Sequence, residues 1–454
     1  MAAVRSLMVL RLLGPEPSGI WKTVMVLYMT GEFLRLGVSK GMAARVPVFA
    51  GQEREEEIAE DIRAAGGYML LTGVVFALLL LGASFLVPNP KYALALRFMA
   101  VIMFFAQPQQ WLRELAAARQ RFDLRGRELL LTGVVDFLAG IALSSVFGLP
   151  GIAAATVFTI GLPVTYLWWK QPEAWRFAWN WPRVRELMKT GIPFSLADSG
   201  FGLLRYTDLL ILSPLLGAVA AGYYQVSMLM TEFSLSIGNF ALSQVIMPHL
   251  LKEYGRSGCL KTAAVFYEKP LRVISYVLPP MLALACVLVE PCVQFFLPQY
   301  TPGIGAARVT VWATFFLWIH MSVTGFFQAA DKYRTIIGLL AAIIPVSIAA
   351  QYAAARSEAG LEGVAWVSLV ILGLTVSAEI WIARAEMGEA PAARLWFIAT
   401  LYAPCLLMLV LSHALLVQTL PLLGRTAVLA LIYTPVLWIY ESKFCMLRVG
   451  RHAT

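Results

Sequence analysis

The stretch that decides the fold is residues 67–87, GYMLLTGVVFALLLLGASFLV. It is a run of about twenty apolar residues, which is the length at which an α-helix crosses the hydrocarbon core of a bilayer. Similar runs recur along the whole chain, which is 59% hydrophobic, only 14% charged, and has a mean hydropathy of +0.72. Soluble domains carry about 25% charged residues. The sequence therefore predicts a protein that crosses a membrane many times.

The apolar runs are continuous and lack the alternation of polar and apolar residues that a membrane β-barrel requires, so they predict helices. We expect an all-α polytopic membrane protein, a two-lobed bundle of thirteen helical spans. The expected spans are residues 20–39, 67–87, 92–112, 129–147, 151–169, 190–213, 221–248, 272–297, 305–328, 335–355, 361–383, 394–416 and 423–440.

The positive charges alternate between the two sets of connections. One set, which includes the tail after Glu441, holds 26 of the 36 lysines and arginines, and the intervening connections hold five. The positive-inside rule places the basic set, and with it the C-terminus, in the cytoplasm. The formal net charge of +9 is thus explained by membrane topology and contact with anionic lipids, and it does not indicate a nucleic-acid partner.

The sequence carries no sign of an enzyme, a metal centre or a cofactor. P-loop, HExxH and GxSxG motifs are absent, and the four histidines have no ligand spacing. The five cysteines form no CxxC pair, which indicates small buried side chains and no disulfide framework. We expect no catalytic residues and no bound metal.

Two segments of the chain resemble each other at an offset of 203 residues. Residues 12–14 (LLG) and 19–21 (GIW) match residues 215–217 (LLG) and 222–224 (GYY), and each pair opens an expected span. Together with the alternating charge, this match predicts a parallel internal repeat, as in transporters that are built from two lobes of the same orientation. The first copy has a shorter lead than the second, so we expect the first helix to be cut short. Either further apolar residues upstream complete it as a fourteenth span, or the first lobe works with a half-helix.

This repeat suggests how the chain divides. The expected parts are an N-terminal lobe at residues 1–170, an interfacial cytoplasmic linker at 171–188, a C-terminal lobe at 189–394, and two final helices with a cytoplasmic tail at 395–454.

The expected span at 190–213 carries more polar side chains than the others. Ser195, Asp198, Gly202 and Arg205 recur at steps of three or four residues and so share one face of a helix. Ser199 and Tyr206 widen this stripe. A charge at the centre of a bilayer costs about 2.5 to 3.5 kcal/mol on insertion scales, unless it meets a partner or a watery cavity. We therefore expect this face to line a polar site.

Two explanations for the arginines remain open. Arg205 either forms an internal ion pair, with Asp208 or Asp198, or presents its charge to an anionic substrate. Arg35 faces the same alternatives, because Glu32 stands three residues before it on a helix and could neutralise it.

Three carboxylates within the spans, Asp136, Asp198 and Glu232, are candidates for ion coupling, with interhelical hydrogen bonding or ion pairing as the simpler alternative. Charged residues nearer the ends of spans should reach toward the interface. These are Arg97, Glu290, Arg308 and Glu379.

Several strings along almost the whole chain resemble the polysaccharide transporter family, which contains the Wzx-type O-antigen flippases of the multidrug/oligosaccharidyl-lipid/polysaccharide (MOP) exporter superfamily. The strings are LGPE at 13–16, GIW at 19–21, GIP at 191–193, RYTD at 205–208, LG at 216–217, GYY at 222–224, FLPQY at 296–300 and DKYR at 331–334.

This resemblance implies a flippase of the bacterial inner membrane that moves an undecaprenyl-diphosphate-linked oligosaccharide between leaflets by alternating access. Its partners would be that lipid-linked oligosaccharide, membrane lipids, and polymerase and chain-length proteins. Arg35 and Arg205 would bind the diphosphate, because guanidinium groups suit phosphate oxygens, and the stripe from Ser195 to Tyr206 would line a cavity for the sugar.

Three alternatives stay open. A cation-coupled multidrug exporter of the same superfamily would favour acidic and aromatic residues in its cavity. A membrane-embedded glycan polymerase or ligase would need a large extracytoplasmic loop, and no outside connection here is long. A structural scaffold for assembly is the third.

Overall fold

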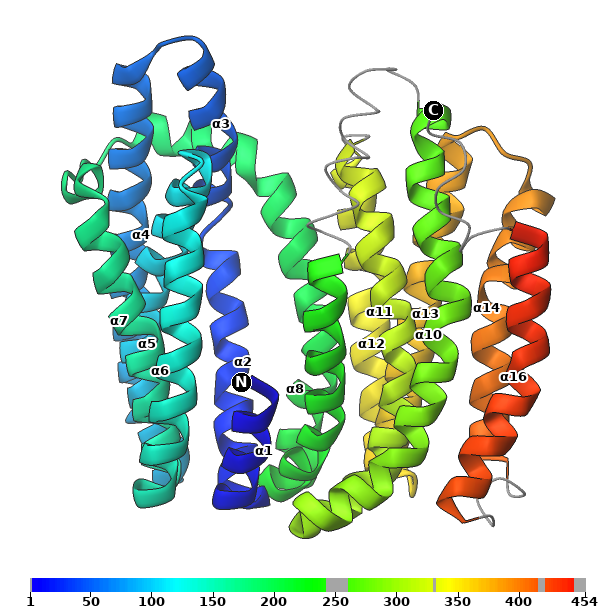
Figure 1. Cartoon of the computed structure of the whole chain (residues 1–454). Coiled ribbons are helices and arrows are strands. Elements are labelled where there is room, and N and C mark those ends of the chain that lie inside the picture. Colours follow the sequence, from blue (N-terminus) through cyan, green and yellow to red (C-terminus); the bar gives the residue numbers. More distant parts are fainter. Residues whose placement is uncertain (1, 242–259, 330–331, 415–420, 445–454) are drawn as a thin grey trace. The chain divides into compact units, whose positions relative to one another are not determined.

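The structure is a computed structural model that describes residues 2–241, 260–329, 332–414 and 421–444. Every regular element in these residues is a helix (Figure 1), which confirms the predicted all-α membrane protein. The elements are α1 (Ala2–Leu13), α2 (Pro15–Leu34), α3 (Val38–Gly51), α4 (Glu55–Ser84), α5 (Pro90–Ala118), α6 (Phe122–Phe147), α7 (Leu149–Lys170), η1 (Pro172–Trp175), α8 (Trp181–Ala241), α10 (Leu260–Phe296), η3 (Pro298–Gly303), α11 (Ile304–Ala329), α12 (Tyr333–Arg356), α13 (Gly360–Glu386), α14 (Pro391–His413) and α16 (Leu422–Phe444).

Nine helices in the described part of the chain are long and apolar enough to cross a membrane. The sequence predicted thirteen spans. Part of the difference between thirteen and nine arises at two places in the chain. The expected spans at 190–213 and 221–248 both lie in α8, which consists of two helices that meet at a kink at Gly217 and is counted as one element. The expected span at 20–39 is divided between α2 and α3 by a turn in which Leu36 and Gly37 both have positive φ.

The predicted cytoplasmic tail lies mostly beyond Phe444, outside the described residues. The expected span at 221–248 and the basic connection after it are described only in part. The residues before Gly14 form α1, a helix of 12 residues.

The chain divides into two compact units, Met1–Gln225 and Val226–Thr454. This division falls within α8, whereas the sequence predicted a linker at 171–188. The first part of α8 belongs to the first unit because its backbone packs directly on α3. A Cβ at Gly191 would lie 1.9 Å from the carbonyl oxygen of Gly37, and one at Gly41 would lie 2.1 Å from that of Leu187. Small residues that allow such close approach are typical of helix contacts in membranes.

The internal repeat is confirmed by backbone geometry. Gly14 (φ 75°, ψ 173°) and Gly217 (φ 86°, ψ 173°) share a conformation that is essentially restricted to glycine. The segments that follow contact each other reciprocally. A Cβ at Gly19 would lie 1.8 Å from the Ala218 carbonyl oxygen, and one at Gly222 would lie 1.9 Å from that of Pro15. The two copies therefore meet through equivalent positions.

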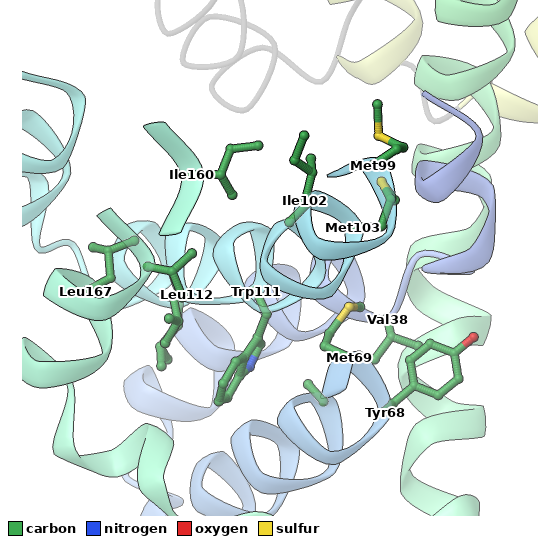
Figure 2. Close-up of a cluster of buried hydrophobic side chains, with 14 of the residues drawn as sticks. Val38, Tyr68, Met69, Met99, Ile102, Met103, Trp111, Leu112, Ile160 and Leu167 are labelled. Carbon is green, nitrogen blue, oxygen red and sulfur yellow. The ribbon is translucent and has the colours of Figure 1, made fainter. Parts of the chain in front are cut away.

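The core of the first unit surrounds α5. Trp111 and Leu112 are fully buried, and they lie in one cluster with side chains from α3, α4 and α7, such as Val38, Met69 and Leu167 (Figure 2). By contrast, α4 leaves apolar side chains such as Leu78 and Leu79 uncovered. Such a band suits contact with lipid, because a soluble protein rarely exposes a large apolar patch.

The second unit is held together by buried hydrogen bonds from helix to helix. Ser275 of α10 donates to the Leu401 carbonyl of α14 at 2.5 Å, and Tyr433 of α16 donates to the Tyr276 carbonyl of α10 at 2.6 Å. These bonds satisfy polar groups that lipid could not, so they fix α14 and α16 against α10.

Candidate functional site

The polar interior of the first unit centres on Arg35, directly after α2. Its side chain is 5% exposed; Nε donates to Oε1 of Gln107 at 2.9 Å, and Nη1 lies 2.8 Å from Oε1 of Glu32. The amide of Gln107 in turn donates to the Gly31 carbonyl at 3.4 Å. Arg35 therefore joins α2 to α5, and the carboxylate of Glu32 compensates its charge. This is the ion pair with Glu32 that the sequence left open as one of two alternatives.

Arg205 lies in a different environment. It is half-buried, and its guanidinium carbon lies 5.6 Å from the centroid of the Tyr206 ring. Within the described residues it has no carboxylate oxygen at ion-pair distance, so the predicted pair with Asp208 or Asp198 is not formed. Asp208 is buried, and its carboxylate accepts a hydrogen bond from the backbone N–H of Leu209 at 2.7 Å. Its interaction with Arg205 is a longer-range attraction between the two charges, without an ion pair.

Asp198 has another partner: its carboxylate contacts the ammonium of Lys40, which links α8 to α3. Asp198 is exposed within the unit, and Gly202 one turn further has open space on its Cβ side. Ser195 is buried instead. The predicted stripe is therefore divided: Ser195 faces the packed interior, whereas Asp198, Arg205 and Tyr206 remain accessible.

Asp136 of α6 is not isolated. Its Oδ1 lies 2.9 Å from Nη2 of Arg5 in α1. Gly140, one turn further, makes room for this contact, because a Cβ there would lie 2.7 Å from Nε of Arg5. The sequence did not reveal the pair, since the arginine and the carboxylate lie on helices that are far apart in the chain. Glu232 lies on α8 in the second unit and is half-buried.

The second unit contains a buried ionisable pair that the sequence analysis missed. Nδ1 of His320 in α11 lies 3.0 and 2.9 Å from the two carboxylate oxygens of Glu379 in α13. Nε2 of the same ring lies 3.2 Å from the hydroxyl of Thr324. Glu379, expected to reach toward the interface, is 1% exposed. Its place within an apolar run was the signal, because a buried carboxylate needs a partner.

One side chain of a neighbouring helix acts on this pair. Tyr402 of α14 is in electrostatic contact with Glu379 and accepts a hydrogen bond from the hydroxyl of Ser377 at 3.1 Å. Elsewhere in the unit, Glu290 and Arg308 pair at 2.6 Å. Within the described residues, no group of three or more His, Cys, Asp or Glu side chains could hold a metal ion.

Solved structures that resemble this chain are membrane transport proteins. An inward-facing multidrug resistance MATE family transporter of the MOP superfamily has a TM-score of 0.69 at 13% identity, covering 86% of this chain and 95% of its own. The lipid II flippase MurJ in an inward closed conformation has a TM-score of 0.66 at 11% identity, covering 98% and 99%. A mutant of the Vibrio cholerae MATE transporter VcmN has a TM-score of 0.59 at 16% identity, covering 86% and 94%.

These likenesses establish the fold, which agrees with the predicted superfamily. No curated protein sequence matches the chain significantly. A family profile described as polysaccharide biosynthesis protein matches residues 8–301, well over half of the chain. The chain therefore belongs to the polysaccharide biosynthesis protein family, with the helical fold of the MOP superfamily.

Proposed function

We propose that the protein is a flippase of the bacterial inner membrane, which moves an undecaprenyl-diphosphate-linked oligosaccharide to the outer leaflet for O-antigen or exopolysaccharide synthesis. Membership of a polysaccharide biosynthesis family supports this function, and so does a fold that is shared with MurJ, which is described as a flippase of lipid II. Alternating access between the two lobes is the mechanism expected of transporters with repeated halves.

The observation that carries the proposal is the state of Arg205. Arg5, Arg35 and Arg308 each contact a carboxylate. Arg205 has none at ion-pair distance within the described residues, although it stands well inside α8. An uncompensated cation in a membrane segment is costly unless an anion or water reaches it. The diphosphate of a lipid carrier is such an anion.

The accessible groups beside Arg205 suit the rest of the substrate. A guanidinium binds phosphate oxygens through two parallel N–H donors. Tyr206 and Asp198 would offer hydrogen bonds to the sugar hydroxyls, next to the diphosphate. Arg35 could take part only after it releases Glu32 and Gln107, so we assign it a positioning role between α2 and α5.

For the driving ion, we assign proton binding to His320 and Glu379 of the second unit. Asp136 and Asp198 are paired with an arginine and a lysine, whereas the carboxylate of Glu379 is buried and its partner is the imidazole of His320, a group that can both accept and donate a proton. Loading and release of a proton at this pair would bias the second unit between two packings. The pair is a candidate for ion coupling because both side chains are buried, and a charge on a buried side chain must be balanced by an opposite charge.

The test uses the purified full chain in liposomes that contain a fluorescent undecaprenyl-diphosphate-linked oligosaccharide. A membrane-impermeant reductant quenches only the outer leaflet, so flipping appears as quenching beyond one half. We expect such quenching with the native chain, its acceleration by a proton gradient, and its loss with Arg205→Ala. Quenching that stays at one half with the folded native chain would contradict the proposal.

The second candidate is a cation-coupled multidrug exporter, favoured by the MATE transporters among the similar structures. The same liposomes distinguish the two functions. An exporter would move a lipophilic cation such as ethidium without flipping the lipid. In that case Asp198, an accessible carboxylate, would be required and Arg205 would not.

A further inference from the structure

The first unit contains a cavity whose lining does not include Arg205. It has a volume of about 360 Å³ and is formed between the beginning of α4, the end of α5 and the segment that follows α7. Its lining residues are Ala59, Ile62, Arg63, Arg119, Pro172, Glu173 and Arg176. The volume is in the usual range for small ligands, about 300 to 1,000 Å³.

The lining of the cavity carries three arginines and one carboxylate. Arg119 lies 3.4 Å from Glu55, and Glu173 lies 4.0 Å from Arg121, so both are partly compensated. Arg63 and Arg176 have no ion pair among the residues that the structure describes. The cavity therefore presents two uncompensated guanidinium groups, which suit an anion with several oxygen acceptors.

Exposed tryptophan side chains beside the cavity indicate that it lies at the level of the lipid headgroups. The tryptophans at 169, 175, 179 and 181 are all exposed on the segment that closes it. Exposed tryptophan rings of membrane proteins concentrate at the headgroup layer. The segment is also fixed in place, because Trp175 donates to the Trp168 carbonyl at 3.1 Å and the Ala178 amide donates to the Arg63 carbonyl at 3.3 Å.

We infer that this cavity is a binding site for the phosphate headgroup of an anionic phospholipid of the cytoplasmic leaflet. The headgroup phosphate would lie between Arg63 and Arg176, and the acyl chains would remain in the bilayer beside the exposed tryptophans. Basic pockets of this kind on the cytoplasmic side of membrane proteins bind anionic headgroups. The inference goes beyond the transported substrate and does not depend on the proposed function.

The test measures binding of phosphatidylglycerol and phosphatidylcholine to the full chain, purified in detergent, by native mass spectrometry. The variant is the double change Arg63→Gln with Arg176→Gln. Its matched control is Arg185→Gln, an exposed arginine at the beginning of α8 that does not line the cavity. Each basic residue near an anionic headgroup contributes about fivefold, so we expect phosphatidylglycerol binding to weaken about thirtyfold in the double variant and to stay within about twofold in the control.

Three results would overturn the inference. The first is equal binding of phosphatidylglycerol and phosphatidylcholine by the native chain, which needs no variant to fold. The second is an equal loss in the variant and in Arg185→Gln, which would show a diffuse charge effect. The third is displacement of phosphatidylglycerol by millimolar inorganic phosphate, which would assign the cavity to a soluble anion. Lipid binding that is selective, lost in the double variant and insensitive to phosphate would support the lipid site.

Discussion

Arg35 and Arg205 look alike in the sequence, since each is an arginine inside an apolar segment with a carboxylate three residues away. The structure separates them. Arg35 is almost fully buried and contacts both Glu32 and Gln107, whereas Arg205 remains accessible and its neighbour Asp208 is turned to a backbone amide. The difference teaches that an intramembrane charge indicates a site only once its partners are known. Arg35 is paired inside the first unit, whereas Arg205 has no carboxylate oxygen at ion-pair distance within the described residues.

The largest effect is expected from Arg35→Ala. Removal of the guanidinium leaves Glu32 and Gln107 without their partner, and breaking a buried ion pair costs about 3 to 5 kcal/mol. Because Glu32 is about one-third exposed, we expect about 3 kcal/mol, seen as a lower midpoint of thermal unfolding in detergent and a lower yield. The double variant with Glu32→Gln should recover part of the loss. If Arg35→Ala were stable but inactive, Arg35 would behave as we expect of Arg205, and we would assign it to substrate binding.

Arg205→Ala should give the opposite pattern. With no ion pair to break, we expect the unfolding midpoint to stay close to native, with a change of less than about 1 kcal/mol, and lipid flipping to be lost. Arg205→Lys should keep part of the activity, because it retains the charge without the planar donor geometry.

The decisive control is the double variant Arg205→Ala with Asp208→Ala. If Arg205 served only to balance the field of Asp208, removal of both charges would restore flipping, because no unmatched buried charge would remain. We expect flipping to stay lost. Recovery would assign Arg205 to the same structural class as Arg35.

A smaller effect, on pH dependence, is expected from His320→Gln and Glu379→Gln. Either change removes one member of the buried ionisable pair, so flipping should continue at a reduced rate and lose its acceleration by a proton gradient. The matched control is His413→Gln, a half-buried histidine of α14 in the same unit, which should retain the acceleration. Unchanged acceleration in both variants of the pair would move the coupling site elsewhere.

The sequence predicted the fold well because membrane spans are coded locally. Most of the run at 67–87 lies in α4, which ends at Ser84, and the repeated glycines at 14 and 217 adopt the same backbone conformation. The division of the chain was harder to predict. It depends on glycines of α3 and α8 that are far apart in sequence and meet only in the folded chain.

The partners of the charged residues could not be predicted for the same reason. A carboxylate such as Asp136 or Glu379 needs a partner, but the sequence does not say which of many distant residues supplies it. The contact of Glu32 with Arg35 was predictable because three residues on a helix fix the geometry. In the structure, the partner of Asp136 is Arg5 and the partner of Glu379 is His320, and both partners are distant in sequence.

The smallest effect is expected at Arg5 and Asp136, a pair between the two extremes of the comparison, since both side chains are about one-fifth to one-quarter exposed. Partly exposed ion pairs contribute about 1 kcal/mol or less, so Arg5→Ala should lower stability by about that amount and leave flipping within about twofold of native. Gly140→Ala should have a similar effect, because its methyl group would approach Nε of the flexible Arg5 side chain and displace it. Asp136→Asn tests the alternative role in ion coupling. Suppose that Asp136→Asn abolished flipping in a chain of native stability, while Arg5→Ala did not. Asp136 would then bind a coupling ion independently of Arg5. An ion pair with an arginine would in that case no longer identify a charged residue of the first unit as structural.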